Sequence, residues 1–353
     1  MSKQNSRTPE NFGEFALIEE IFQSGNEAML LQLPKHDQVR IKNAVLLGIG
    51  DDGALLQTDP EEALAITTDM LVSGRHFFSN ANPNDLGHKA LAVNLSDLAA
   101  MGAKPLGFTL AISLPEANRA WLAGFAQGLF SLAQQFACPL IGGDTTAGPL
   151  TISITAFGSV SKKHALLRSS AKVNDDIWVS GTLGDARFAL GVLRQEWNDQ
   201  NHELGNAEKL HRPSPRVELG IALRGIANAC CDISDGLLGD LSHILQASQV
   251  GAEIKIDSLP CSSLLQTQGL ALRRQCTAAG GDDYELCFTA AADQGEKIKK
   301  ISQALNLPIT RVGKVIADKN AQLILLDASN KPLAANETTK LLKSFDHFKR
   351  EAN

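Results

Sequence analysis

Short apolar runs with the composition of β-strands alternate with segments of helical periodicity along the chain. The strand-like runs include residues 44–49, 63–67, 152–160, 177–180 and 252–256. Apolar residues recur at helical spacing within residues 85–101, 120–136, 185–197, 216–229, 237–245 and 295–305. The first two runs are followed by glycine, threonine and aspartate, so we expect those strands to end at acidic turns. Alternation throughout both halves predicts a protein of the mixed α/β class.

The length of 353 residues favours two domains. A mostly polar and basic stretch begins near residue 161, and a new strand-like run follows it at residue 177. We therefore place the domain boundary near this stretch. The expected organisation is a flexible tail over residues 1–12, an N-terminal domain over 13–160 and a C-terminal domain over 161–353.

Charge and composition restrict the class of function. The formal net charge of −6 argues against a nucleic-acid-binding protein, which normally presents a basic face. No apolar run approaches the roughly 20 residues of a membrane span, and the N-terminus lacks the apolar core of a signal peptide. The six cysteines form no C-x-x-C pair and have no zinc-like spacing. We expect a cytoplasmic protein that binds neither nucleic acid nor membranes.

The segment from Gly48 to Gly53 matches the pattern G-x-G-x-x-G of dinucleotide-binding loops, and Asp69 lies near the position of the ribose-binding acid. Physical chemistry disfavours this interpretation. Asp51 and Asp52 place two carboxylates inside the loop, where they would repel a pyrophosphate, and the residues that follow predict a strand instead of the required helix. A Walker A sequence is also missing from the chain.

Aspartates recur at the ends of apolar runs, most of them beside glycine, at positions 51, 52, 69, 144, 232, 235, 282 and 283. A single aspartate in this context is usually a turn former or a helix cap. The whole set is better explained as hard oxygen ligands without cysteine or histidine partners, which suit Mg²⁺. Magnesium ions would supply the positive charge that an acidic chain needs to bind a polyphosphate.

Several segments together resemble the thiamine-monophosphate kinase family, whose superfamily includes aminoimidazole ribonucleotide synthetase and selenophosphate synthetase. They occur in order and span nearly the whole chain: GEFALI (13–18), GIGDDGALL (48–56), TTDMLVSGRHF (67–77), KALAVNLSDLAAMGAKP (89–105), IGGDTTAGPL (141–150), LRSSAK (167–172), HRPSPR (211–216), DISDGLLGDLSHI (232–244), GGDDYELCF (280–288) and FDHF (345–348).

The resemblance implies transfer of the γ-phosphate of ATP to thiamine monophosphate, with thiamine diphosphate as product, in the last step of its biosynthesis. It also implies two α/β domains with mixed sheets, a homodimer whose N-terminal domains form a shared β-barrel, and a site in the cleft between the domains. The implied magnesium ligands are Asp52, Thr67, Thr68, Asp69, Asp97, Asp144, Asp232 and Asp235. The implied ATP contacts are Gly143, Asp144, Arg168 and Ser234, and the implied thiamine monophosphate contacts are His76, Asp282 and Phe345.

Two acceptor contacts differ from the family pattern. Asp282 stands where the family often has glutamate, and Phe345 stands where an aromatic residue with a polar tip is common. The acceptor is a phosphate monoester with a second pKa of about 6, so it is mostly a dianion at neutral pH and needs no general base. We therefore expect direct transfer that depends on positioning and on charge neutralisation by metals and Arg168.

Three alternatives stay open. One is another enzyme of the superfamily, although a selenophosphate synthetase would need a reactive cysteine near the N-terminus, and the first cysteine here is Cys138. An aminoimidazole ribonucleotide synthetase would lack the GGDDYELCF and HRPSPR segments in this form. The second is a non-catalytic Mg-nucleotide-binding protein, and the third is an NAD-dependent oxidoreductase built on Gly48 to Gly53.

Overall fold

A computed structural model describes residues 18–50, 52–197 and 207–342. The chain divides into two compact units. The first comprises the described residues up to 57, together with 68–91 and 106–155, and the second comprises 58–67, 92–105 and the described residues from 156 onward. The predicted tail over 1–12 lies outside the described residues, and the domain boundary near 161 stays a prediction.

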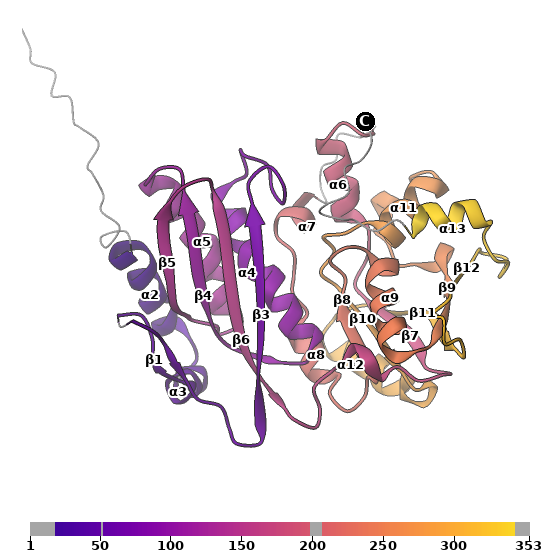
Figure 1. The fold of residues 1–353 in the computed structure, drawn as a ribbon, viewed down its shortest axis with the longest axis horizontal. Coiled ribbons are helices and arrows are strands. Elements are labelled where there is room, and N and C mark those ends of the chain that lie inside the picture. Colours follow the sequence, from indigo (N-terminus) through magenta and orange to yellow (C-terminus); the bar gives the residue numbers. More distant parts are fainter. Residues whose placement is uncertain (1–17, 51, 198–206, 343–353) are drawn as a thin grey trace, which may run out of the picture. The chain divides into compact units, whose positions relative to one another are not determined.

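The N-terminal part of the chain folds around a four-stranded sheet of order β3-β6-β4-β5 (Figure 1). The helices α4 and α5 lie against this sheet (Figure 1). The elements are η1 (Ile18–Gln23), α2 (Ser24–Gln32), α3 (Lys35–Ala44), β1 (Val45–Leu47), β2 (Leu55–Leu56), β3 (Glu62–Val72), α4 (Pro83–Ala100), β4 (Lys104–Leu114), α5 (Arg119–Gln135), β5 (Leu140–Ala147) and β6 (Thr151–Ser161).

The four-stranded sheet is open in the described part of the chain, with β3 and β5 at its edges. A closed barrel is not found within these residues, so the dimer-spanning barrel stays a prediction. Strand β3 also presents apolar side chains outward: Leu64, Ile66 and Met70 are 40%, 60% and 57% exposed. These three residues alternate along the strand, so they lie on one face of the sheet.

The C-terminal part of the chain contains a six-stranded sheet of order β12-β9-β11-β7-β10-β8. All its pairings are antiparallel except that of β12 with β9. Its elements are η2 (Arg168–Ser170), β7 (Asp176–Ser180), α6 (Asp185–Leu193), α7 (Ala207–His211), α8 (Val217–Ala222), β8 (Ala229–Asp232), α9 (Leu237–Ser248), β9 (Gly251–Lys255), η4 (Ile256–Ser258), α10 (Ser263–Gln266), α11 (Leu270–Ala279), β10 (Leu286–Ala290), η5 (Ala292–Gln294), α12 (Gly295–Ala304), β11 (Ile309–Ile316), β12 (Leu323–Leu326) and α13 (Ala335–Leu341).

The periodic helices were predicted well where their apolar face is long. In α5, Leu122, Phe125 and Leu129 are buried as expected, and the Asn118 side chain caps the helix by accepting from the Trp121 N–H at 3.0 Å. The helix predicted over 216–229 was wrong beyond residue 222. Gly225 there adopts a left-handed φ of 73°, which a helix cannot continue through, and the chain enters β8 at Ala229.

Candidate functional site

Strand β3 positions Thr67, Thr68 and Asp69. The sequence predicted that this strand ends at Thr67, but it continues to Val72, because β-branched and apolar residues follow the acid and suit extended backbone. Thr67 Oγ1 donates a hydrogen bond to Asp97 Oδ2, whereas the Thr68 and Thr155 hydroxyls share a hydrogen bond of 2.8 Å. Consecutive strand residues point to opposite faces, so the two threonines serve different sides of the sheet.

Strand β5 carries Gly143 and Asp144. The sequence placed Asp144 at the end of an apolar run, but both residues belong to the strand, where Asp144 pairs with Ala111 of β4 and its side chain is exposed. Gly143 permits this pairing, because a Cβ at its position would lie 2.0 Å from the Leu110 carbonyl oxygen. Only glycine allows the two backbones to approach so closely.

Two further predicted site residues lie in turns of the N-terminal part. Asp52 is exposed in the turn between β1 and β2, and its neighbour Asp51 lies outside the described residues. His76 follows β3, and its Nδ1 accepts a hydrogen bond of 2.9 Å from the Val72 N–H. In the neutral ring, Nε2 therefore carries the proton.

Asp97 lies on α4 among polar partners of the second unit. Burial raises the pKa of this carboxyl, while the hydrogen bond from Thr67 and the positive charge of Arg168 partly offset the effect. The predicted ATP contact Arg168 thus lies close enough to a predicted metal ligand to influence its ionisation. Its backbone is also held in place, since Ser248 Oγ donates to the Arg168 carbonyl at 2.8 Å and accepts from the Ala171 N–H at 3.0 Å.

Asp232 ends strand β8 and is only 3% exposed. The buried Ser96 hydroxyl donates a hydrogen bond of 2.9 Å to Asp232 Oδ2. Ser96 immediately precedes Asp97 on α4, so one helix contacts one predicted metal ligand and contributes another. Sequence reasoning missed Ser96. Its position beside Asp97 is a signal, but its partner is 136 residues away.

The turn after β8 is held by a residue that sequence reasoning also missed. Asp240, on the first turn of α9, accepts hydrogen bonds through one oxygen from the Ser234 N–H at 3.0 Å and the Asp235 N–H at 3.1 Å. Burial, reinforced by the nearby charge of Asp235, raises the pKa of Asp240 to about 7. A fixed acceptor thereby orients the backbone of two predicted site residues.

Asp282 lies next to this turn. Its N–H donates to the Ser234 carbonyl at 2.8 Å, and the Tyr284 N–H donates to the Ile233 carbonyl at 2.8 Å. Strands β8 and β10 pair directly, with Leu286 opposite Asp232, so the loops at this shared end meet. Asp282, the predicted contact for thiamine monophosphate, is therefore adjacent to the turn that contains Ser234 and the predicted metal ligand Asp235, within one unit.

The structure thus brings together one part of the predicted set through hydrogen bonds, neighbouring positions in the chain and the charge of Arg168, and this part comprises Thr67, Asp97, Arg168, Asp232, Ser234, Asp235 and Asp282. The first unit contains Asp52, Thr68, Asp69, His76, Gly143 and Asp144. Phe345 lies outside the described residues. Among the residues that the structure describes, no three histidine, cysteine or acidic side chains converge closely enough to form a preassembled metal site.

The donor chemistry nevertheless fits magnesium. Every predicted ligand offers oxygen, which is the donor that Mg²⁺ prefers. The carboxylates of Asp97 and Asp240 carry raised pKa values because of burial. A bound cation would favour their ionised forms. Phosphate oxygens and water commonly complete a magnesium shell, so protein side chains alone need not converge on one point.

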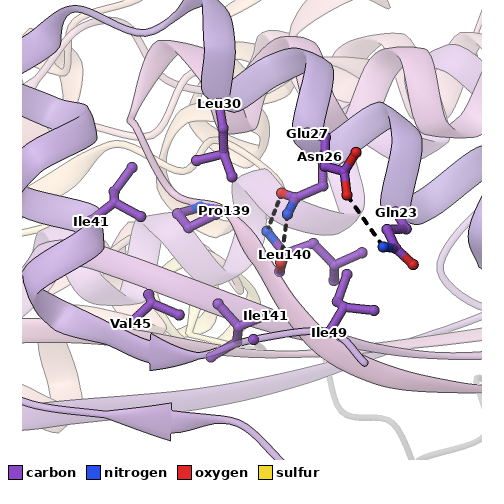
Figure 2. Close-up of a pocket in the computed structure, with 11 residues that line it drawn as sticks. Gln23, Asn26, Glu27, Leu30, Ile41, Val45, Ile49, Pro139, Leu140 and Ile141 are labelled. Carbon is purple, nitrogen blue, oxygen red and sulfur yellow. Dashed lines mark hydrogen bonds between the residues drawn. The ribbon is translucent and has the colours of Figure 1, made fainter. Parts of the chain in front are cut away.

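A separate pocket of about 200 Å³ lies in the first unit and is lined mainly by apolar residues of α2, α3 and the start of β5 (Figure 2). Asn26 closes one side by donating to the Leu140 carbonyl at 3.0 Å and accepting from the Leu140 N–H at 2.9 Å (Figure 2). None of the residues predicted for the site lines this pocket.

Family models agree with the two-domain architecture. The model described as "AIR synthase related protein, N-terminal domain" matches residues 50–160, and that described as "AIR synthase related protein, C-terminal domain" matches residues 172–325. The chain therefore has the two-domain α/β fold with mixed sheets of the AIR synthase related proteins. Within the described residues, no helix is long and apolar enough to cross a membrane.

Individual relatives identify the family within the AIR synthase related proteins. The chain is 42% identical over 344 residues to thiamine-monophosphate kinase of Escherichia coli K12, covering 95% of this chain and 98% of that protein. The crystal structure of thiamine-monophosphate kinase from Stenotrophomonas maltophilia K279a matches with 47% identity and a TM-score of 0.78, covering 88% and 96% of the two chains. A structure described as AaThiL complexed with AMPPCP and TMP matches with 28% identity and a TM-score of 0.70, covering 98% and 100%. The chain belongs to the thiamine-monophosphate kinase family.

Proposed function

We propose that this protein is a kinase that transfers the γ-phosphate of ATP to thiamine monophosphate, giving thiamine diphosphate and ADP, in the last step of thiamine diphosphate biosynthesis. The observation that carries the proposal is the set of hydrogen bonds in the second unit that groups Asp97, Asp232 and Asp282, with the positive charge of Arg168 acting on Asp97. Family membership over nearly the full chain supports the choice of substrates.

Magnesium would be held by the oxygen ligands Asp52, Thr67, Thr68, Asp69, Asp97, Asp144, Asp232 and Asp235. When bound, the ions would neutralise charge on the two polyanionic substrates. ATP would be contacted by Gly143, Asp144, Arg168 and Ser234, and the acceptor by His76, Asp282 and Phe345. The Asp282 N–H donates to the Ser234 carbonyl at 2.8 Å, so a proposed acceptor contact lies beside a proposed ATP contact, as transfer between the two substrates requires.

The chemistry requires positioning more than proton transfer. A bond forms between a phosphate oxygen of thiamine monophosphate and the γ-phosphorus, while the bond to the bridging oxygen of ADP breaks. The acceptor oxygen is already anionic near neutral pH, so we propose in-line transfer with no general base and no phosphorylated enzyme. The guanidinium of Arg168 would bind phosphate oxygens through several N–H donors and offset their charge.

We also propose a homodimer in which the four-stranded sheets of two copies associate. Its support is the outward apolar face of β3, formed by Leu64, Ile66 and Met70, together with edge strands at both sides of the open sheet. Burying these side chains against a second copy would favour association by the hydrophobic effect. A cytoplasmic location is consistent with six cysteines that are all free thiols.

The decisive experiment incubates the protein with Mg²⁺, ATP and thiamine monophosphate and separates the products by chromatography. We expect thiamine diphosphate and ADP in equal amounts, with no thiamine diphosphate when a chelator is present or when thiamine replaces thiamine monophosphate. No thiamine diphosphate under any condition would refute the proposal. ADP with inorganic phosphate alone would instead indicate another activity of the superfamily.

A further inference from the structure

The loop before β10 has unusual backbone geometry. Asp282 and Tyr284 both adopt positive φ angles, 67° and 49°, in the left-handed region. A bulky side chain is rarely stable there, so such a conformation persists only where the surroundings impose it. The loop also carries the proposed acceptor contact Asp282. The contacts that impose this geometry therefore bear on how the acceptor is bound.

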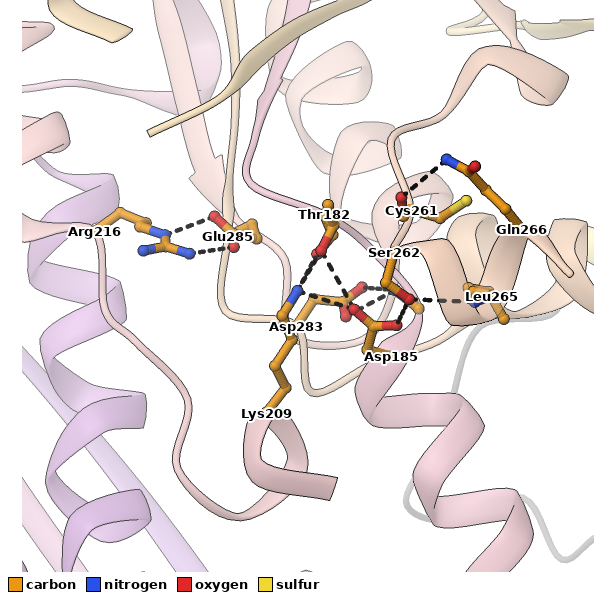
Figure 3. Close-up of polar contacts among 11 residues, drawn as sticks. Thr182, Asp185, Lys209, Arg216, Cys261, Ser262, Leu265, Gln266, Asp283 and Glu285 are labelled. Atoms are coloured by element: carbon orange, nitrogen blue, oxygen red, sulfur yellow. Dashed lines mark hydrogen bonds and ion pairs between the residues drawn. The ribbon is translucent and has the colours of Figure 1, made fainter. Parts of the chain in front are cut away.

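The residues that alternate with them, Asp283 and Glu285, are turned into the interior and are 6% and 2% exposed. Asp283 accepts the Gly184 N–H with both oxygens, at 2.9 and 3.0 Å. Glu285 forms a two-point ion pair with Arg216, whose Nε lies 2.7 Å from Oε2 (Figure 3), and it accepts the Ser180 hydroxyl at 2.6 Å. Each buried carboxylate thus has a dedicated donor.

The backbone that surrounds these carboxylates is tightly packed. Gly184 has a φ of 90°, and a Cβ there would lie 2.8 Å from the backbone carbonyl carbon of Cys276. At Gly181, a Cβ would lie 2.0 Å from Glu285 Oε1. Beyond them, Lys209 connects Asp185 and Thr182 of the same segment, with its Nζ 3.1 Å from Asp185 Oδ2 (Figure 3). The side chains on the interior side of the loop, Asp283 and Glu285, are therefore closely packed and held by hydrogen bonds.

Two anchors on alternate residues leave Asp282 and Tyr284 with a different orientation from Asp283 and Glu285. The Tyr284 hydroxyl lies 3.5 Å from Asp282 Oδ1, so these two side chains stay together. Their backbones are bonded to the turn that contains Ser234. The direction of the Asp282 carboxylate is thereby set by contacts on the opposite side of the loop.

We infer that Arg216, Glu285 and Asp283 are positioning residues for acceptor binding: they hold the Asp282–Tyr284 turn in its left-handed conformation and so direct the Asp282 carboxylate toward thiamine monophosphate. This inference rests on the proposed function, since it takes Asp282 as an acceptor contact. It predicts that weakening the anchor impairs binding of the acceptor and leaves binding of ATP unaffected.

Arg216→Lys is the sharpest test, because lysine keeps the charge but cannot form the planar two-point contact. We expect KM for thiamine monophosphate to rise about tenfold, with KM for ATP changed less than about twofold. Arg274→Lys is the matched control: Arg274 forms a two-point pair with Asp257, at 2.7 and 2.8 Å, and also donates to Glu337, and both partners lie outside the loop. Both variants should lose thermal stability, whereas only Arg216→Lys should change KM for the acceptor.

Hydrogen exchange supplies a readout that does not depend on catalysis. Without ligands, the peptide covering 280–286 should exchange faster in Arg216→Lys than in the wild type, and at the wild-type rate in Arg274→Lys. Glu285→Gln, which keeps the shape of the side chain, serves the same comparison if Arg216→Lys does not fold. Unchanged exchange and unchanged KM, or equal effects on both substrates, would overturn the inference. A wild-type protein that is inactive on thiamine monophosphate would refute the proposed function instead. In that case, hydrogen exchange of residues 280–286 would still show whether Arg216 holds the loop in place.

Discussion

The predicted carboxylates of the two units differ in how firmly the protein holds them. In the second unit, Asp232 is buried and bonded to Ser96, and Asp240 fixes the backbone of the turn that follows. In the first unit, Asp52 and Asp144 have exposed side chains, one in a turn and one on a strand. One group is buried and oriented by hydrogen bonds before any ligand arrives, whereas the other is exposed to solvent.

This difference separates stability from activity. A buried carboxylate loses hydration on folding and needs a compensating cation or donor, so the protein's stability depends on what binds there. An exposed carboxylate keeps its hydration and contributes little to stability. We therefore expect substitutions in the second unit to alter both stability and turnover, and substitutions in the first unit to alter turnover alone.

The largest expected effect compares Asp144→Asn with Asp232→Asn. Each should lower kcat about 100- to 1,000-fold, because each removes a charge that the proposed mechanism directs at the transferring phosphate and its metals. In a chelating buffer, only Asp232→Asn should change the melting temperature, since Asp232 is 3% exposed and Asp144 is exposed. Unchanged turnover in Asp144→Asn would show that its assignment as a metal ligand is wrong.

A smaller effect is expected at Ser96. Ser96→Ala removes the donor that orients Asp232, so the Mg²⁺ concentration for half-maximal activity should rise about tenfold. Ser242→Ala is the control, because among the described residues the Ser242 hydroxyl is bonded only within α9, to the Leu238 carbonyl at 2.6 Å. If both variants require the same Mg²⁺ concentration as the wild type, Ser96 does not orient a metal ligand.

The smallest effect on activity is expected at Asp240, where stability should instead depend on pH. Its pKa of about 7 in the folded protein exceeds the ordinary value, so its contribution is fully present below about pH 4 and is lost as pH rises through 7. Across this pH range, the ionisation of Asp240 lowers the free energy of unfolding by at most about 4 kcal/mol. Asp240→Asn keeps an oxygen acceptor for both N–H groups but cannot ionise, so its free energy of unfolding should fall less between pH 5 and pH 8.

Urea unfolding in a chelating buffer at the two pH values measures this difference. The control is Asp293→Asn, which removes the same charge from an exposed position of η5. Parallel pH dependence in the wild type and Asp240→Asn would contradict a raised pKa at this carboxyl.

Part of the fold was predictable because its cause is local. The apolar stripe of α5 produces a helix at nearly the expected bounds, and α4 begins and ends within two residues of the prediction. Strand lengths were predicted less well. Thr68, Asp69 and Asp144 were placed at strand ends, yet they lie within β3 and β5, since cross-strand pairing can keep a polar residue in extended backbone.

The candidate site also has features that the sequence predicts and features that depend on tertiary contacts. The sequence by itself determined which oxygen-bearing residues are available, their suitability for magnesium and phosphate, and, through its ordered motifs, the family. Only the tertiary structure decided that Ser96 meets Asp232, that Asp240 holds the turn at Ser234, and that Arg216 anchors the loop of Asp282. Ser96 and Asp232 are 136 residues apart in the sequence, and Ser234 and Asp240 are 6 residues apart. Arg216 acts on the loop through Glu285, which is 69 residues away from it. Local periodicity encodes helices and strands, but contacts between distant side chains depend on strand order and register, which no local pattern specifies.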